Sequence, residues 1–143
     1  MPTRNPPSAV ILVVDDEPAV SRLLSRYLTH LGYRVVEASS GEQALAAIRL
    51  RRPRIDLVLC DIMMPGMDGV ELAAAVLAKC PGPSVLLMTG QLPQEMKPID
   101  VAGRIVPVLR KPMNFDELRE LLQVTLEGYP PDVEAESAHC AER

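Results

Sequence analysis

Short apolar runs alternate along this chain with segments of helical periodicity, and this alternation restricts the fold more than any other feature. Continuous apolar runs cover residues 10–14, 57–60, 85–88 and 105–109, and a partly alternating run covers residues 33–38. The corresponding strands are expected over residues 10–14, 55–60, 84–88, 105–109 and 33–38. A strand buried on both faces reads as a continuous apolar run. Strands that alternate with helices build a parallel sheet covered by helices on both sides. The pattern predicts an α/β fold with five strand–helix repeats, (βα)5.

The segments between the runs carry helix signals. Residues 18–31 place apolar side chains three and four positions apart, and Gly32 is typical of a helix end. Ser40 and Gln43 have the spacing of a capping box, which predicts a second helix. A third helix is expected to begin near Gly69.

The region before the last strand is harder to assign. Pro93 suits a helix start, but Pro98 would break a helix within two turns, so any helix in residues 91–103 is expected to be short or irregular. Pro107 lies inside the run 105–109 and cannot donate a hydrogen bond to a sheet. This strand is therefore predicted to lie at an edge.

Length and composition limit the domain organisation. With 143 residues, 48% hydrophobic and 24% charged, the chain fits one globular domain. We expect a flexible leader over residues 1–8, a folded part over residues 9–127 and a polar, disordered tail over residues 128–143. The last helix of the folded part is predicted to begin after Asn114, which suits an N-cap.

Charge and hydropathy exclude several classes of function. The net charge of −4 argues against general binding of nucleic acid, which needs a basic face. No apolar run reaches the roughly 20 residues of a membrane span, and the first residues lack a signal-peptide core. We therefore expect a cytoplasmic protein without nucleic-acid or membrane partners. The spacing of the cysteines fits no zinc site, and Cys60 is interpreted as a core residue.

Polar side chains stand where the predicted strands end. Asp15 and Asp16 follow the first strand, Asp61 the third, Thr89 the fourth and Lys111 the fifth. Because the carboxyl ends of parallel strands share one edge, these groups are expected to meet in one cleft. Taken alone, Asp61 fits a turn or helix cap equally well. Five fitting strand ends together favour a functional site.

The chemistry of this set points to phosphoryl transfer. Three clustered carboxylates repel one another, and a hard divalent cation such as Mg²⁺ relieves that repulsion. A carboxylate can act as a nucleophile toward phosphorus. A lysine and a hydroxyl group beside it can stabilise charge on the transferring oxygens.

At this point the chain resembles the receiver domain of two-component response regulators, over about residues 9–127. The motifs that carry the resemblance lie at residues 13–18, 61–69, 89–90 and 111–112. The resemblance implies a flavodoxin-like, doubly wound sandwich with a five-stranded parallel sheet in the order 2-1-3-4-5. It also implies a signalling receiver that catalyses only its own phosphotransfer and autodephosphorylation.

The resemblance assigns a role to each group. Asp61 is the expected phosphoacceptor, and its phosphoryl group is expected to come from a histidine kinase or a histidine phosphotransfer protein. Thr89 and Lys111 are expected to contact phosphoryl oxygens, and the Lys111–Pro112 peptide bond is expected to be cis. Mg²⁺ is the implied cofactor. Its implied ligands are Asp15 through water, Asp16, Asp61 and the backbone carbonyl of Met63. The methionine side chains around the loop (Met63, Met64 and Met67) are interpreted as loop and core residues, because the nearby ligands are hard oxygens. Asp68 and Gly69 are interpreted as loop and helix-start residues.

The chain departs from the family pattern in two places. Similar proteins carry Tyr or Phe three residues before the lysine, where this chain has Val108. The proline-rich segment at residues 91–103 falls in the region through which receivers commonly signal. We therefore expect normal phosphorylation with an unusual readout.

Only a short polar segment follows residue 127, so the leading interpretation is a stand-alone receiver, monomeric or weakly dimeric. It would act through an unknown downstream protein, or as a phosphate shuttle or sink. The alternatives are a fragment of a hybrid histidine kinase or longer regulator, and a phosphorylation-independent scaffold. A metal-dependent phosphatase is disfavoured, because position 63 is methionine where such enzymes commonly carry a second acid.

Overall fold

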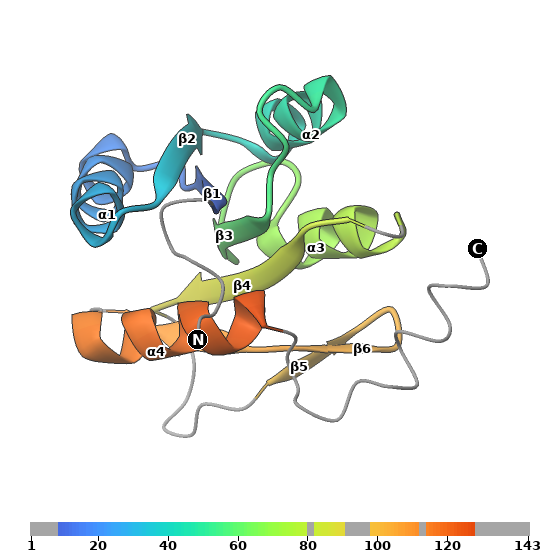
Figure 1. Ribbon diagram of the computed structural model, residues 1–143. Coiled ribbons are helices and arrows are strands. Elements are labelled where there is room, and N and C mark those ends of the chain that lie inside the picture. The colour runs from blue at the N-terminus through green and yellow to red at the C-terminus, as the bar shows by residue number, and fades with distance from the viewer. Residues whose placement is uncertain (1–8, 80–81, 91–97, 112–113, 128–143) are drawn as a thin grey trace.

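A computed structural model of the chain describes residues 9–79, 82–90, 98–111 and 114–127. Over these residues it contains one five-stranded sheet, one two-stranded hairpin and four helices (Figure 1). The sheet strands are β1 (Val10–Val14), β2 (Arg34–Ala38), β3 (Leu57–Asp61), β4 (Ser84–Thr89) and β7 (Val108–Arg110). The helices are α1 (Pro18–Leu31), α2 (Gly41–Leu50), α3 (Gly69–Leu77) and α4 (Phe115–Leu126).

The five-stranded sheet is parallel throughout, with the strand order β2-β1-β3-β4-β7. Counting β7 as the fifth sheet strand, this is the predicted order 2-1-3-4-5 of a flavodoxin-like fold. The first strand lies in the centre and pairs with both β2 and β3. The chain therefore reverses its direction of winding between β1 and β3, and in such folds ligands bind beyond the carboxyl ends of the strands at that point.

Two hydrophobic layers explain why the central strands are apolar at every position. In β1, Ile11 and Val13 pack with α1 and α4, whereas Leu12 and Val14 pack with α2 and α3. In β3 the side chains alternate in the same way. Both faces of these strands are covered, so no position is left for a polar residue until the strand ends.

The helix ends follow the predicted capping chemistry. Gly32, after α1, has a φ of 105°, which is the left-handed conformation that favours glycine at a helix end. The Ser40 side chain accepts the Gln43 backbone N–H, at 3.1 Å. The Gln43 side chain, however, accepts from the backbone N–H of Ser39 rather than from that of Ser40, so the capping box is only half formed.

The described part of the segment after β4 forms a hairpin that was not predicted. Strands β5 (Ile99–Val101) and β6 (Arg104–Val106) pair antiparallel. The short or irregular helix expected within residues 91–103 stays a prediction, because residues 91–97 lie outside the described residues. Ala102 and Gly103 make its turn with φ angles of 53° and 85°. Both central residues of a tight hairpin turn commonly have positive φ, because the turn must match the twist of the strands.

The strand expected at residues 105–109 is divided at Pro107 into β6 and β7. The edge position of β7 is confirmed, since it pairs only with β4 in the five-stranded sheet. The carbonyl of Pro107 accepts the backbone N–H of Leu87 at 3.0 Å, so the proline joins the edge without needing an N–H of its own. Asn114 caps α4 by accepting the Glu117 backbone N–H, as predicted.

No helix in the described part of the chain is long and apolar enough to cross a membrane. The expected leader (residues 1–8), the expected tail (residues 128–143), Pro93 and the Lys111–Pro112 peptide bond lie outside the described residues.

Candidate functional site

The carboxyl edge of the sheet brings the predicted site residues together. Asp61 is the last residue of β3, and Thr89 is the last residue of β4. Asp15 follows the end of β1, and its backbone N–H bonds to the carbonyl of Ala38 at the end of β2. Lys111 follows β7, and its backbone N–H donates to the carbonyl of Thr89 at 2.9 Å. The sheet register therefore fixes where each of these side chains begins.

A lysine bridges two buried carboxylates at the centre of the site. The Nζ atom of Lys111 lies 2.8 Å from Oδ2 of Asp61 and 3.2 Å from Oδ2 of Asp15. Asp61 is 6% exposed and Asp15 is 1% exposed. Charges buried to this extent are costly without partners, and a charge-assisted hydrogen bond offsets much of that cost. The lysine thus holds both carboxylates in place.

Backbone amides hold the opposite oxygen of each carboxylate. Oδ1 of Asp61 accepts the N–H of Met63 at 3.1 Å, and Oδ1 of Asp15 accepts the N–H of Glu17 at 2.9 Å. Each donor lies two residues after its acceptor, in the loop that leaves the strand. Local bonds of this kind fix the side-chain rotamer. Both carboxylates are therefore oriented before any ligand arrives.

The pKa values reflect the crowding of charge. Burial raises the pKa of Asp15 above its usual value, against the lowering effects of the Glu17 N–H and of Lys111, and the charge of Asp61 raises it further. Burial alone would lower the pKa of Lys111, but the bonds and charges of Asp61 and Asp15 outweigh it and raise that pKa. The site thus carries more negative charge than one lysine can neutralise.

The acidic residues fit a hard divalent cation. Asp15, Asp16 and Asp61 each present a carboxylate oxygen, and these atoms all lie within 4.8 Å of one another. Asp16 is exposed, so one side of the cluster is open to solvent. Mg²⁺ favours a few carboxylates together with water molecules. This set provides the carboxylates, and its open side gives access to water. The role of the Met63 carbonyl as a further ligand stays a prediction.

Gly69 and Asp68 shape the loop rather than supply reactive groups. A Cβ atom placed on Gly69 would lie 2.4 Å from the carbonyl oxygen of Asp61 and 2.7 Å from Cα of Ile62. Asp68 forms a full capping box with Glu71 at the start of α3. The start of this helix therefore packs directly on the backbone of Asp61, a contact for which the sequence offered only the glycine itself as a signal.

Neighbouring residues have the predicted structural roles. Met64 is buried at 8% exposure and Met67 packs against the same core, whereas the side chain of Met63 is 55% exposed. Cys60 is fully buried, and burial raises the pKa of its thiol well above the usual value. It is therefore a core residue, as expected. Val108 is 7% exposed and also packs in the core.

Comparison with known proteins agrees with this geometry. The family model of the response regulator receiver domain matches residues 11–123. The positive alginate biosynthesis regulatory protein of Pseudomonas aeruginosa is 39% identical over 116 residues, which are 79% of this chain and 45% of that protein. The signal receiver domain of an HD domain-containing protein from Pseudomonas fluorescens Pf-5 superposes with a TM-score of 0.71 at 29% identity, covering 83% of this chain and 94% of that structure. Vibrio cholerae chemotaxis protein CheY4 superposes with a TM-score of 0.69 at 29% identity, covering 82% of this chain and 98% of that structure.

The chain spans half or less of the length of the curated relatives it matches first. It covers 45% of the Pseudomonas aeruginosa protein and 27% of the Escherichia coli transcriptional regulatory protein GlrR. The similarity therefore concerns the receiver portion of these regulators, and their activities as whole proteins do not follow from it.

Proposed function

Because the chain belongs to the response regulator receiver family, we propose that Asp61 accepts a phosphoryl group from a phosphohistidine of a partner protein. The partner would be a histidine kinase or a histidine phosphotransfer protein. The observation that carries the proposal is the position of Lys111, whose Nζ atom lies 2.8 Å from Asp61 and 3.2 Å from Asp15. A cation at this place can stabilise the negative charge on the phosphoryl oxygens during the transfer.

The transfer exchanges one bond for another. A carboxylate oxygen of Asp61 forms a bond to phosphorus while the bond from phosphorus to the imidazole nitrogen breaks. That nitrogen keeps the electron pair, and with a proton on the other ring nitrogen the histidine leaves as a neutral imidazole. Lys111 would pair with one phosphoryl oxygen and the hydroxyl of Thr89, which is 2% exposed at the end of β4, would bond to another. Catalysis here is mainly positioning and charge stabilisation.

The carboxylate cluster supports a cofactor role for Mg²⁺. Asp15, Asp16 and Asp61 would hold the ion, with the Met63 carbonyl as a further ligand. When bound, the ion supplies positive charge that offsets both the carboxylates and the phosphoryl oxygens. The protein's own contribution is the rigid orientation of Asp15 and Asp61 by the N–H groups of Glu17 and Met63.

We further propose an unusual route from the phosphorylated site to a downstream protein. Val108 has no ring to rotate, and the hairpin β5–β6 lies directly before β7, in the region through which receivers commonly signal. Backbone NMR shifts, recorded with and without beryllofluoride as a phosphoryl mimic, test this. We expect the largest changes near residues 61–69 and 89–90. Large changes along residues 98–110 would instead indicate the ordinary receiver readout.

Intact-mass measurement tests the phosphoacceptor directly. The protein is incubated with Mg²⁺ and a small-molecule phosphodonor, and we expect one phosphoryl adduct that disappears with EDTA. Asp61→Asn should abolish the adduct. The matched control Asp68→Asn should keep it, because asparagine also caps helices well. If neither an adduct nor a stable beryllofluoride complex forms, the scaffold alternative replaces this proposal.

A further inference from the structure

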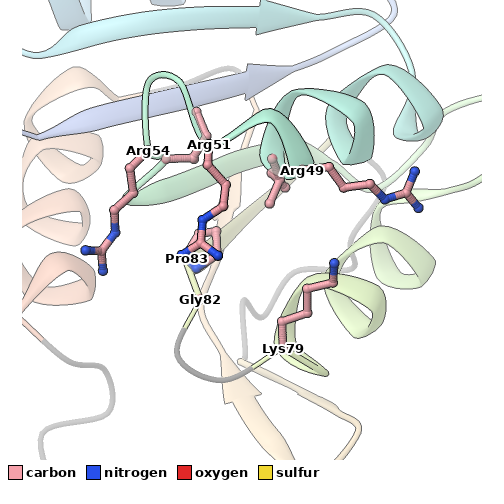
Figure 2. A pocket seen from close by; sticks show the side chains of 8 residues that line it. Arg49, Arg51, Arg54, Lys79, Gly82 and Pro83 are labelled. Carbon is pink, nitrogen blue, oxygen red and sulfur yellow. The ribbon is translucent and has the colours of Figure 1, made fainter.

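A pocket lies at the amino-terminal ends of the sheet strands, opposite the carboxyl ends that carry the aspartates. Its volume is about 420 Å³, and it is formed where the chain enters β3 and β4 (Figure 2). Ile55 lies just before β3 and Pro83 just before β4, whereas Asp61 and Thr89 close those strands at the other edge. At about 3.3 Å per residue, the six steps from Ile55 to Asp61 separate the two places by roughly 20 Å. The pocket is therefore not part of the phosphorylation site.

The rim of this pocket is cationic. Arg49, Arg51, Arg54 and Lys79 line it, and no acidic residue is among the lining residues. None of these four side chains forms an ion pair or hydrogen bond within the described part of the chain. The whole protein carries a net charge of −4, so four clustered cations that have no acidic partner among the described residues are a strong local exception. Such a concave cationic surface attracts anions.

The geometry of the rim suits a ligand that carries several phosphate groups. Figure 2 shows the side chain of Arg51 reaching from the end of α2 toward Pro83, and the side chain of Lys79 reaching toward α2 from the other wall. Arginine binds phosphate through paired, parallel hydrogen bonds, and lysine binds it as a point charge. Cations on two facing walls can therefore hold adjacent phosphates from both sides.

Arg51 occupies an unusual backbone position for its residue type. It ends α2 with a φ of 58°, the left-handed conformation in which glycine usually stands at a helix end. A side chain at this position has a conformational cost. A glycine at this position would have no side chain, whereas the guanidinium of Arg51 lines the pocket.

The walls between the cations are apolar. Ile55 is 5% exposed, and Ile48 and Pro83 are half-buried beside it. A pocket of this volume, with apolar walls and a few charged groups, is within the size range of small-molecule sites. A neighbouring pocket of about 220 Å³ shares Arg54 and contains Asp56, whose carboxylate accepts the N–H of Val10. That carboxylate therefore already has a partner.

From these observations we propose that this pocket binds a nucleoside polyphosphate, with the phosphates on the cationic rim and the nucleoside against the apolar wall. The site is independent of phosphorylation at Asp61, so the failure of either proposal leaves the other unaffected.

Titration with ATP, followed by backbone NMR shifts in EDTA, tests the proposal. The absence of divalent cations keeps the ligand from bridging to the aspartates. We expect saturable shifts in residues 48–55 and at Lys79 and Gly82. Inorganic triphosphate should move the same amides with weaker affinity, because it lacks the nucleoside. Shifts centred on Lys111 and Gly90 would instead place ATP at the phosphorylation edge and overturn the proposal.

Matched charge variants separate a site from general attraction. Arg51→Gln with Lys79→Gln should weaken ATP binding about tenfold or more, because charge-assisted hydrogen bonds are lost. Arg22→Gln with Arg119→Gln removes the same charge from exposed positions on α1 and α4, and should leave the affinity unchanged. Equal weakening by both pairs, or no saturation with the unaltered protein, would refute a built site.

Discussion

Replacing Gly69 by alanine tests whether the start of α3 positions the phosphoacceptor. The added Cβ atom would lie 2.4 Å from the carbonyl oxygen of Asp61 and 2.7 Å from Cα of Ile62. Both are backbone atoms, so no flexible side chain can move aside. The Gly69 N–H also bonds to the carbonyl of Ile62 at 2.9 Å, which ties the two segments together. Relief of the clash must therefore displace either the helix start or Asp61 itself.

The size of the effect follows from two opposing contributions. Overpacking of this kind costs about 1–3 kcal/mol. Alanine in place of glycine in a helix gains at most about 1 kcal/mol. We expect Gly69→Ala to lower the free energy of unfolding by about 1–2 kcal/mol. Phosphorylation of Asp61 should slow by about tenfold or more, because a small displacement of a reacting group is costly.

Denaturant unfolding gives the first quantity, and the rate of adduct formation by intact mass gives the second. Gly66→Ala is the matched control in the same loop. Gly66 has a φ of 74°, and a Cβ placed there has no atom within 4 Å. Gly66→Ala should lower the free energy of unfolding by about 1–2 kcal/mol through backbone strain. Phosphorylation of this variant should continue at the normal rate. If Gly69→Ala is as stable and as rapidly phosphorylated as the unaltered protein, the proposed packing constraint is wrong.

Three further perturbations have defined outcomes. Lys111→Met should bind Mg²⁺ about fivefold more tightly by calorimetry, because a competing cation is lost, and should slow phosphorylation about 10²-fold; weaker Mg²⁺ binding would contradict the charge arrangement. Asp15→Asn should raise the free energy of unfolding of the metal-free protein at neutral pH. Because the pKa of Asp15 is raised in the folded protein, its protonated carboxyl stabilises the fold relative to the charged carboxylate. That stabilisation is fully present below the unfolded pKa of 3.8 and is lost as the pH rises through the folded pKa. Urea unfolding at several pH values should show this gain shrinking toward acid, and a gain that grows toward acid would reverse the sign. Asn114→Ala should cost about 1 kcal/mol in thermal or denaturant unfolding, through loss of the cap on Glu117, and an unchanged stability would show that the cap contributes nothing.

The sheet and its active edge were predictable because their signals are local. Each central strand buries both faces, so an apolar run marks the strand and the first polar residue marks its end, as at Asp61 and Thr89. The parallel arrangement then places all strand ends at one edge, including Asp15 and Lys111. The pairing of Lys111 with both carboxylates could not be predicted from the sequence. Lys111 is 50 residues from Asp61 and 96 residues from Asp15, so these contacts depend on the register of the strands that carry them.

The hairpin after β4 was missed because two prolines dominated the interpretation of that segment. Ala102-Gly103 between two short runs is a hairpin signal of moderate strength, but the runs are only three residues long. The division of the last strand at Pro107 has the same origin, because a proline can join an edge strand through its carbonyl alone. The cationic pocket was also missed, since its members come from two separate segments and meet only in the folded chain.

Chemical trapping of the modified residue tests phosphorylation at Asp61 most directly. The protein is phosphorylated with Mg²⁺ and a small-molecule donor, the acyl phosphate is reduced with borohydride to homoserine, and the peptides are sequenced by mass spectrometry. Phosphorylation at Asp61 predicts homoserine at position 61 alone. Homoserine at position 15, 16 or 68, or an acid-stable phosphate on Thr89, would contradict the assignment of Asp61 as the phosphoacceptor.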